Sequence, residues 1–335
     1  MNKEEQTILE ITKQFINNKN IKENKLPCID WDKLESIHSY NLIGGIVYEK
    51  LKHSSSIPKN KKLELKNNYK NVLMYSLLLK KELDRVSKIF QKNKIRFLVF
   101  KGASMVSQGY YKIGLREFMD IDILILEEDK KRAVEILKAN GFGLFEQIHS
   151  KKYLEEFSTQ LPFVKKVGMV DCHIDLHWQV FEKTDPYNIS IEELFQHSKK
   201  NYLCPEHEVI LISTFLAHHD LFRSPLKYLV DISLLLKKNQ INWDFLIKTS
   251  KNWGVSSSTY FAFKKIRPLL DLQIPNKVMN QLYADSNKLD LLVKKVLVEK
   301  NILKIRRHKF GLRQALNEIL LSNRKCLLLK RFFSN

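Results

Sequence analysis

The sequence predicts an α+β protein in which a small mixed sheet is preceded and followed by helical regions. Residues 1–94 carry apolar side chains at helical spacing, residues 95–182 contain short β-branched and aromatic runs, and residues 183–335 return to helical spacing. Only 10 glycines and 8 prolines occur in the chain, which favours regular structure with few long loops. We therefore divide the chain into an N-terminal helical region, a core and a C-terminal helical region with these bounds.

One long predicted helix dominates the N-terminal region. The stretch from Lys61 to Gln91 contains neither proline nor glycine, and its apolar positions form a single stripe at helical spacing. Ahead of it, Asp30 before Trp31 is typical of a capped helix start. Packing is the simplest role for this region.

The core is predicted to contain four strands and a helix. The strands are expected at residues 95–100, 118–126, 161–167 and 170–178. A helix from Glu127 to Ala139 is expected between the second and third strands, with acidic residues at its start and Gly141 just past its end. Alternation in the last strand places Val170, Cys172, Ile174 and Leu176 on one face, and Asp171, His173, Asp175 and His177 on the other.

The C-terminal region is predicted to be helical, without an internal repeat or a low-complexity linker. Apolar stripes indicate helices at residues 207–221, 226–238, 243–253 and 278–303.

The chain is strongly basic. It has 57 Lys and Arg against 37 Asp and Glu, a formal net charge of +20, and the regional excess lies in residues 300–335. Such a charge favours a polyanionic partner, such as nucleic acid, nucleotide phosphates or an anionic membrane face. A coding bias towards Lys, Asn and Ile would produce the same charge, so nucleic acid stays an open alternative.

The cysteines and the apolar stretches predict a cytoplasmic protein without a membrane span. The start of the chain is acidic where a signal peptide would be basic and then apolar. Its unbroken apolar stretches are far shorter than the roughly 20 residues that cross a bilayer. Four widely separated cysteines form no C-x-x-C pair, which favours reduced thiols: Cys28, Cys172, Cys204 and Cys326.

Asp120-Ile121-Asp122 is the most informative motif. Residues i and i+2 of a strand share a face, so two carboxylates stand together on an otherwise apolar strand. Close carboxylates repel each other, and a divalent cation commonly relieves the repulsion. Oxygen ligands alone suit Mg²⁺ or Mn²⁺. The simpler alternative is a strand end whose acids face water.

A loop and a third acid support the metal hypothesis. Lys101-Gly102 follows the first strand and opens a short helix, where Gly102 and the helix N-terminus could approach a phosphate. Ser104 adds a hydroxyl, and Lys101 or Arg116 could add positive charge; an ordinary strand-to-helix turn is the alternative. Asp175 on the last strand would complete the carboxylate set of two-metal phosphoryl transfer.

Two other metal-binding patterns occur in the sequence. His173, Asp175 and His177 share a strand face and could bind Zn²⁺, but the chain offers no convincing fourth ligand. His173 and His177 fit better as hydrogen-bond partners of the carboxylates or of phosphates. His218-His219-Asp220 with Asp231 resembles the HD phosphohydrolase pattern but lacks its upstream His. These groups more simply line a cleft or cap helices.

The order of these motifs resembles the uncharacterised nucleotidyltransferase family of the DNA polymerase β-like superfamily. The resemblance covers roughly residues 70 to 255 and rests on the following segments: Lys101-Gly102, Leu115-Arg116-x-x-Met119-Asp120-x-Asp122, Asn140-Gly141-Phe142, Asp175-Leu176-His177-Trp178, His218-His219-Asp220, Leu226 to Ile232 and Asn242-Trp243. The superfamily has Ser directly after the loop glycine, whereas here Ala103 intervenes before Ser104.

The resemblance implies a polymerase β-like core and a metal-dependent enzyme. Such an enzyme would transfer a nucleoside monophosphate from an NTP to an acceptor hydroxyl or phosphate and release pyrophosphate. Two Mg²⁺ or Mn²⁺ ions would bind to Asp120, Asp122 and Asp175. Asp175 would also help to deprotonate the acceptor. The nucleotide-binding candidates are Lys101, Gly102, Ser104, Arg116 and His177.

The acceptor and two alternatives stay open. Similar members of the family favour a small molecule, a sugar or a modified peptide as the acceptor. One alternative is a non-catalytic nucleic-acid or nucleotide-binding protein on the same fold. The other is a toxin-like enzyme that nucleotidylates tRNA or protein.

Overall fold

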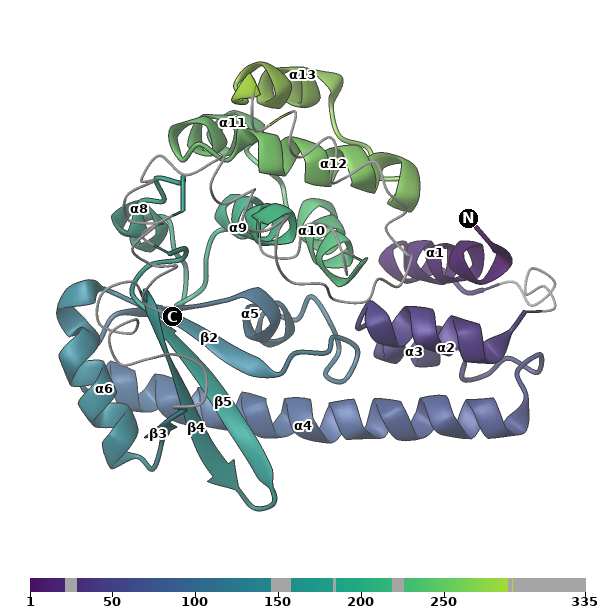
Figure 1. Cartoon of the computed structure of the whole chain (residues 1–335), viewed down its shortest axis with the longest axis horizontal. Helices are drawn as coiled ribbons and strands as arrows, with labels where there is room; N and C mark the ends of the chain where they lie inside the picture. The colour runs from purple at the N-terminus through teal and green to yellow at the C-terminus, as the bar shows by residue number, and fades with distance from the viewer. Residues whose placement is uncertain (22–28, 146–157, 183–184, 219–225, 289–290, 292–335) are drawn as a thin grey trace, which may run out of the picture. The chain divides into compact units, whose positions relative to one another are not determined.

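The computed structural model describes residues 1–21, 29–145, 158–182, 185–218, 226–288 and 291. Its helices and strands are labelled in Figure 1. Their order is α1 (Lys3–Ile16), α2 (Trp31–Tyr40), α3 (Gly44–Leu51), α4 (Lys59–Lys92), β1 (Phe97–Phe100), α5 (Lys101–Ser107), β2 (Asp120–Ile125), the 3-10 helix η2 (Glu127–Asp129), α6 (Lys130–Ala139), β3 (Gly143–Leu144), β4 (Gln160–Val167), β5 (Val170–His177), α8 (Ile191–Gln196), α9 (Pro205–His218), α10 (Leu226–Lys238), α11 (Trp243–Asn252), α12 (Ser256–Leu270) and α13 (Asn276–Ala284).

The described residues form two compact units, each assembled from separate parts of the sequence. One unit contains the described residues of 1–77, 108–117 and 205–291, and is helical. The other contains residues 78–107 and 118–204 and includes the sheet. These two units are defined by which residues contact one another in space. The three regions proposed from the sequence, with boundaries after residues 94 and 182, rest on changes of pattern along the chain and stay a prediction.

The sheet has five strands in the order β1-β2-β5-β4-β3. β2 and β5 are parallel, and the remaining neighbours are antiparallel. The two strands that carry the candidate acids are therefore direct neighbours inside the sheet, where both of their edges are paired.

The two faces of this sheet differ in chemistry. Directly paired residues share a face, so Phe100, Asp122 and Asp175 project from one side and Ile123 and Leu176 from the other. The apolar side packs against the second half of α4, where the rings of Phe90 and Phe97 meet edge to face with their centroids 5.6 Å apart. The acids consequently stand on the face opposite to the one that α4 covers.

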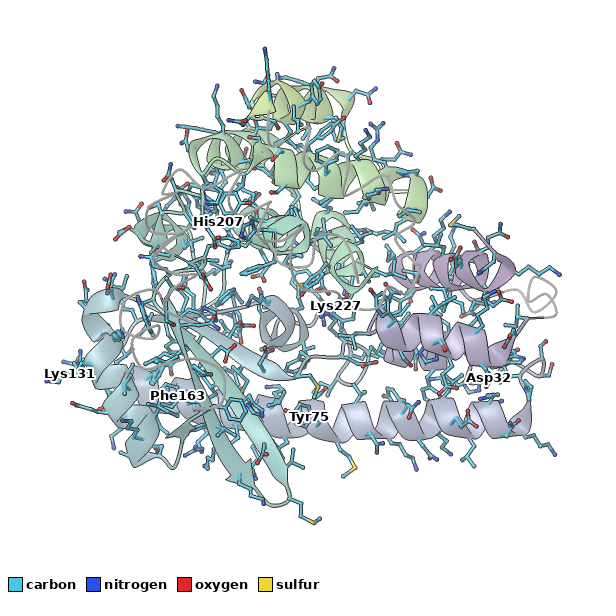
Figure 2. All side chains as sticks on the ribbon, in the orientation of Figure 1. Asp32, Tyr75, Lys131, Phe163, His207 and Lys227 are labelled. Carbon is cyan, nitrogen blue, oxygen red and sulfur yellow. The ribbon has the colours of Figure 1, made fainter. Side chains whose placement is uncertain are left out.

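The sheet unit buries its apolar residues in the pattern that the strand alternation predicts. Figure 2 labels Phe163 in β4, which is fully buried, and Lys131, which extends from α6 into solvent. α6 ends at Ala139 with Asn140 as its C-cap, and Gly141 adopts a left-handed φ of 84° that favours glycine over other residues. The predicted helix end is confirmed at this point.

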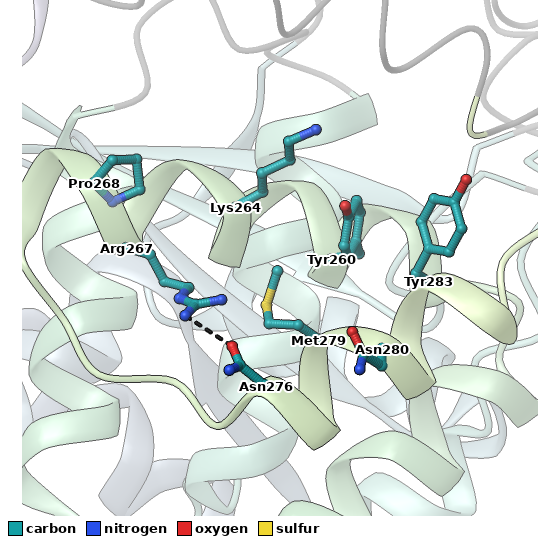
Figure 3. A pocket seen from close by; sticks show the side chains of 8 residues that line it. All are labelled: Tyr260, Lys264, Arg267, Pro268, Asn276, Met279, Asn280 and Tyr283. Atoms are coloured by element: carbon teal, nitrogen blue, oxygen red, sulfur yellow. Dashed lines mark hydrogen bonds between the residues drawn. The ribbon is translucent and has the colours of Figure 1, made fainter.

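The helical unit is built around α9, which is buried along nearly its whole length and packs against α10, α11 and α12. α12 in turn packs against α13, and a pocket lies between these two helices (Figure 3). In α2, the side chain of Asp30 accepts a hydrogen bond from the backbone N–H of Lys33 at 3.1 Å, which confirms the predicted cap.

The structure confirms the α+β fold with a small mixed sheet and adds elements that the sequence patterns did not predict, among them α3. The sequence patterns missed β3, which is only two residues long, and α12, which contains Pro268. The helix predicted over residues 278–303 is wrong in its extent, because α13 ends at Ala284 and the chain turns at Asp285. Residues 292–303, like the basic segment 300–335, lie outside the described residues. No helix in the described part of the chain is both long and apolar enough to cross a membrane.

Candidate active site

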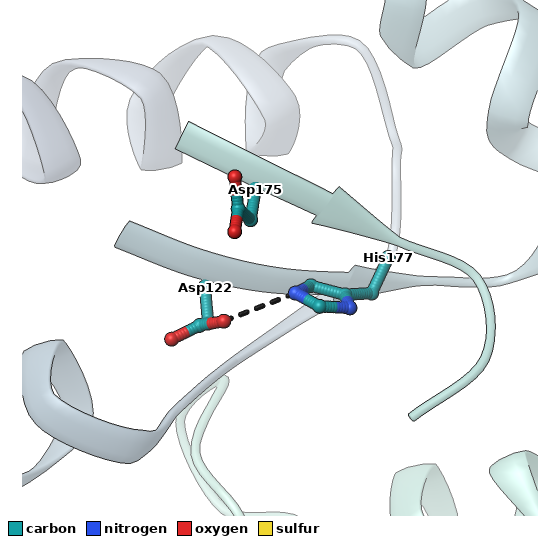
Figure 4. A group of neighbouring side chains, drawn as sticks. All are labelled: Asp122, Asp175 and His177. Atoms are coloured by element: carbon teal, nitrogen blue, oxygen red, sulfur yellow. Dashed lines mark hydrogen bonds and ion pairs between the residues drawn. The ribbon is translucent and has the colours of Figure 1, made fainter. Parts of the chain in front are cut away.

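The carboxylates of Asp122 and Asp175 meet because β2 and β5 are parallel neighbours. In their register Asp122 lies opposite Asp175, and Asp120 lies opposite His173. Figure 4 shows Asp122 and Asp175 on the same side of the two strands, with His177 beside them. One ligand atom from each of Asp122, Asp175 and His177 lies within 4.8 Å of the other two, close enough for one metal ion to bind all three.

Asp122 is buried as a charged group with two partners. Its Oδ1 accepts hydrogen bonds from Lys101 Nζ at 2.7 Å and from His177 Nε2 at 3.0 Å, and the residue is 2% exposed. Burial alone would raise the pKa of Asp122, but Lys101 and His177 outweigh it and lower this pKa to about 2. The carboxylate is therefore ionised throughout the physiological pH range.

His177 serves as a neutral donor. Burial lowers the pKa of His177, although the hydrogen bond to Asp122 opposes the shift. A neutral imidazole whose Nε2–H donates to Asp122 satisfies this geometry. His177 therefore donates a hydrogen bond to a carboxylate, as one of its predicted roles requires, and its nucleotide-binding role stays a prediction.

Asp175 has a different environment. It is half-buried and accepts no hydrogen bond from any described residue. Burial raises the pKa of Asp175 to about 7, and the charges of Asp122 and Asp120 add to the shift. A half-buried carboxylate next to two others, without a donor of its own, is electrostatically unfavourable unless a cation or a proton accompanies it.

Asp120 is coupled to this cluster but lies outside the group of three. It precedes Asp122 by two residues on the same strand face, and its charge contributes to the high pKa of Asp175. The structure groups Asp175 and His177 with Asp122 rather than with His173, whose ring meets Phe145 edge to face. Within the described residues, the donor set is therefore mainly carboxylate oxygen, which suits Mg²⁺ or Mn²⁺ better than Zn²⁺.

Lys101 lies at a strained junction between strand and helix. It directly follows β1 and begins α5 with a left-handed φ of 56°, which is uncommon for a residue with a side chain. Its ammonium group pairs with Asp122 and lies 5.0 Å from the centre of the Phe100 ring. The strand-to-helix turn explains why a lysine 21 residues before Asp122 can reach it.

Gly102 is constrained by packing against the chain itself. A Cβ atom at this position would lie 2.6 Å from the Cβ of Phe118, so the absence of a side chain lets α5 approach the segment that enters β2. Ser104 is fully buried, so its hydroxyl is not presented to solvent. The contact of Gly102 with Phe118 is sufficient to require glycine, and a phosphate-binding role for either residue stays a prediction.

We expect Gly102→Ala to destabilise the protein by about 1–3 kcal/mol, the usual cost of forcing an extra methyl group into a packed site. Urea unfolding followed by circular dichroism measures this difference. Gly143→Ala is the matched control, because nothing lies within 4 Å of a Cβ at Gly143. Equal stability of both variants would show that the approach of Phe118 relaxes without cost.

The position of Arg116 in the sequence suggested a phosphate contact, but in the structure its side chain binds the carboxylate of Asp231. Its Nε and Nη2 donate to the Asp231 carboxylate, with the shortest distance 2.7 Å, and its Nη1 donates to the Glu117 carbonyl oxygen. Tyr111 donates to the same carboxylate at 2.6 Å, and the side chains of Tyr111, Arg116 and Asp231 are buried in the helical unit. Arg116 therefore binds Asp231 in this structure, and its nucleotide-binding role stays a prediction.

The same ion pair bears on the phosphohydrolase alternative. Asp231 lies inside α10 and binds Arg116, so it does not cap a helix, and within the described residues no metal-binding group of three or more contains Asp231 and His218. His219 and Asp220 lie outside the described residues.

A mixed sheet with acids on its parallel central pair is an arrangement suited to phosphoryl transfer. The chain matches the family described as uncharacterised nucleotidyltransferase over residues 27–271, and it belongs to that family. The mixed sheet is consistent with a small polymerase β-like core, and the family supports nucleotidyl transfer as the general activity, with an NTP as substrate. No curated protein matches the chain.

Proposed function

We propose that the protein is a metal-dependent enzyme that moves a nucleoside monophosphate from an NTP to an acceptor. The observation that carries this proposal is Asp175, a half-buried carboxylate without a hydrogen-bond donor among the described residues, facing the ionised Asp122. Repulsion between these carboxylates is relieved by a cation. Asp120, Asp122 and Asp175 would hold Mg²⁺ or Mn²⁺, as two ions.

The bound ions would neutralise phosphate charge and polarise the phosphorus–oxygen bond that breaks. Asp122 would keep its charge for them because its pKa is low. The acceptor oxygen would form a bond to the α-phosphorus while the bond to the β-phosphate oxygen breaks, and pyrophosphate would leave. With a hydroxyl acceptor, the Asp175 carboxylate would help to take up the hydroxyl proton.

Lys101 would have two alternative anionic partners. Without nucleotide, its ammonium neutralises Asp122 at 2.7 Å, and its side chain is only 25% exposed. Once a metal ion supplies positive charge to Asp122, the Lys101 ammonium could move to an oxygen of the triphosphate. This role combines the observed ion pair with the predicted phosphate contact.

Incubation of the full chain with each NTP and Mg²⁺, followed by measurement of pyrophosphate release, tests the activity. Mass spectrometry of added sugars, small molecules, peptides and RNA then identifies which acceptor gains a nucleoside monophosphate. We expect transfer to a small molecule, a sugar or a peptide. The expectation about the acceptor would be contradicted if pyrophosphate is released and the nucleoside monophosphate is found on RNA but on no small molecule, sugar or peptide.

We expect the affinity for Mn²⁺ to rise with pH up to about pH 7 and then to level off. Below its pKa of about 7, Asp175 carries a proton that the metal must displace. The apparent affinity should therefore fall about tenfold for each pH unit below this pKa. Calorimetric titration in buffers of different ionisation enthalpy should show about one proton released per metal ion at a pH one unit below the pKa.

Asp175→Asn provides the control for this pH dependence. Between pH 3.8 and about 7 the folded metal-free protein holds a proton on Asp175 that the unfolded chain releases, so this group makes stability fall as pH rises. Asn at this position should remove that part of the slope and raise the melting temperature of the metal-free protein above neutral pH. Unchanged pH profiles for both stability and Mn²⁺ affinity would exclude Asp175 as a metal ligand.

A further inference from the structure

A pocket of about 490 Å³ lies between α12 and α13, in the helical unit. Its size is in the range of pockets that hold small ligands. One face of each helix lines it, as Figure 3 shows, with residues spaced three or four apart. The lining residues are Tyr260, Lys264, Arg267 and Pro268 from α12, and Asn276, Met279, Asn280 and Tyr283 from α13.

Two tyrosine rings offer a stacking surface at this pocket. The ring centres of Tyr260 and Tyr283 lie 5.3 Å apart at 57°, one from each helix. Tyr283 is 55% exposed, which is unusual for a large aromatic side chain in the described part of the molecule. Exposed aromatic faces of this kind bind planar rings by stacking, and every nucleobase provides such a ring.

The pocket is also positively charged. Lys264 and Arg267 line it, and no acidic side chain does among the described residues. Lys264 contacts the rings of Tyr260 and Phe261 and forms no ion pair with a described acid, whereas Arg267 Nη2 donates to Asn276 Oδ1 at 3.0 Å. Both cations therefore keep their charge available to a ligand.

We propose that this pocket binds a nucleoside phosphate, with the base on the tyrosines and the phosphate on the two cations. Asn276 and Asn280 place amide groups, each both donor and acceptor, where the edge of a base could be read. Aromatic rings and cations together bind single-stranded nucleic acid, and the same two kinds of contact suit the base and the phosphate of a free nucleotide. No residue of the pocket belongs to the carboxylate cluster, so this proposal does not rest on the proposed reaction.

The test uses the full chain carrying Asp122→Asn, in EDTA, so that metal-dependent binding at the carboxylates is suppressed. Three probes are titrated by calorimetry at physiological salt: a hexauridine oligonucleotide, ATP and inorganic pyrophosphate. We expect Tyr283→Ala to weaken nucleotide or oligonucleotide binding about tenfold, and Tyr283→Phe to retain it, because stacking needs the ring and not the hydroxyl.

Charge variants give a second and independent readout. Lys264→Gln should weaken binding of the same probe. With the oligonucleotide it should also flatten the log–log salt dependence by about 0.7 for the lost phosphate contact. Lys277→Gln is the matched control, since Lys277 is an exposed lysine on α13 that does not line the pocket. Because these side chains are exposed, the variants are expected to fold, and circular dichroism checks this.

Each outcome decides the proposal. Binding of hexauridine alone identifies the ligand as single-stranded nucleic acid, and equal binding of ATP identifies it as a free nucleotide; both support a nucleoside phosphate site. Three results would overturn the proposal. These are no binding of hexauridine or ATP, wild-type affinity in Tyr283→Ala, and binding of pyrophosphate as tight as that of the nucleotide. Because the metal site is already disabled, failure here leaves the nucleotidyltransferase proposal untouched.

Discussion

Asp122→Asn is expected to lower Mg²⁺-dependent NTP turnover by about 1,000-fold or more. A neutral amide cannot balance the charge of a divalent ion, and a loss of this size corresponds to about 4 kcal/mol of transition-state stabilisation. Asp122 is the ionised member of the cluster, with a pKa of about 2, and it contacts both Lys101 and His177. Initial rates of pyrophosphate release for the wild-type and variant proteins measure the effect.

Asp171→Asn is the matched control for this experiment. Asp171 lies on the same strand face as Asp175, four residues earlier in β5, and is exposed. The same chemical change there should leave turnover within about twofold of wild type, because an exposed carboxylate away from the cluster holds no metal. Melting temperatures of both variants separate catalysis from folding, since the amide oxygen that Asp122→Asn introduces can still accept a hydrogen bond from Lys101. Turnover by Asp122→Asn at the rate of Asp171→Asn would place the reaction elsewhere.

The strands and the acidic face could be predicted because their signals are local. Alternation of period two in residues 170–177 assigned Asp175 and His177 to one face, and the apolar neighbours of Asp122 identified a buried strand. The structure bears out both strands. Local patterns contain no information about strand pairing, however, so they could not predict the parallel register that sets Asp122 opposite Asp175.

Long-range partners account for what the sequence could not reveal. Arg116 stands close to the D-x-D motif in sequence, which suggested a phosphate contact, yet its partner Asp231 lies 115 residues away. Glycine is needed at position 102 because Phe118 packs closely against it, and no local sequence pattern around Gly102 indicates this contact. The bond from Lys101 to Asp122 could have been suspected from a lysine at the end of a strand adjacent to an acidic strand.

Removing one partner of the buried ion pair between Arg116 and Asp231 is expected to destabilise the helical unit strongly. Arg116 is 4% exposed and Asp231 is 1% exposed, and Tyr111 donates a further hydrogen bond to the same carboxylate. Burial opposes the charge on Arg116, but Asp231 outweighs it and raises the pKa of Arg116. Burial, with Asp231 beside it, also raises the pKa of Tyr111, which keeps its hydroxyl protonated as a donor.

Asp231→Asn should therefore lower the free energy of unfolding by about 3–5 kcal/mol, because it leaves the Arg116 charge buried without a counterion. Chemical unfolding in urea measures the loss. Asp84→Asn is the control: Asp84 pairs with Lys80 on the surface of α4, with side chains 56% and 36% exposed, and its loss should cost about 0–1 kcal/mol. Similar losses in the two variants would show that the buried pair contributes no more than a surface pair.

The double variant Arg116→Met/Asp231→Leu completes the test and addresses the nucleotide-binding hypothesis for Arg116. Replacing both charges by apolar side chains removes the unpaired ion, so the double variant should be more stable than Asp231→Asn alone. If Arg116 serves only to hold Asp231, the folded double variant should bind a non-hydrolysable NTP with the affinity of the wild-type protein. A loss of NTP affinity in this folded variant would instead return Arg116 to the nucleotide-binding residues.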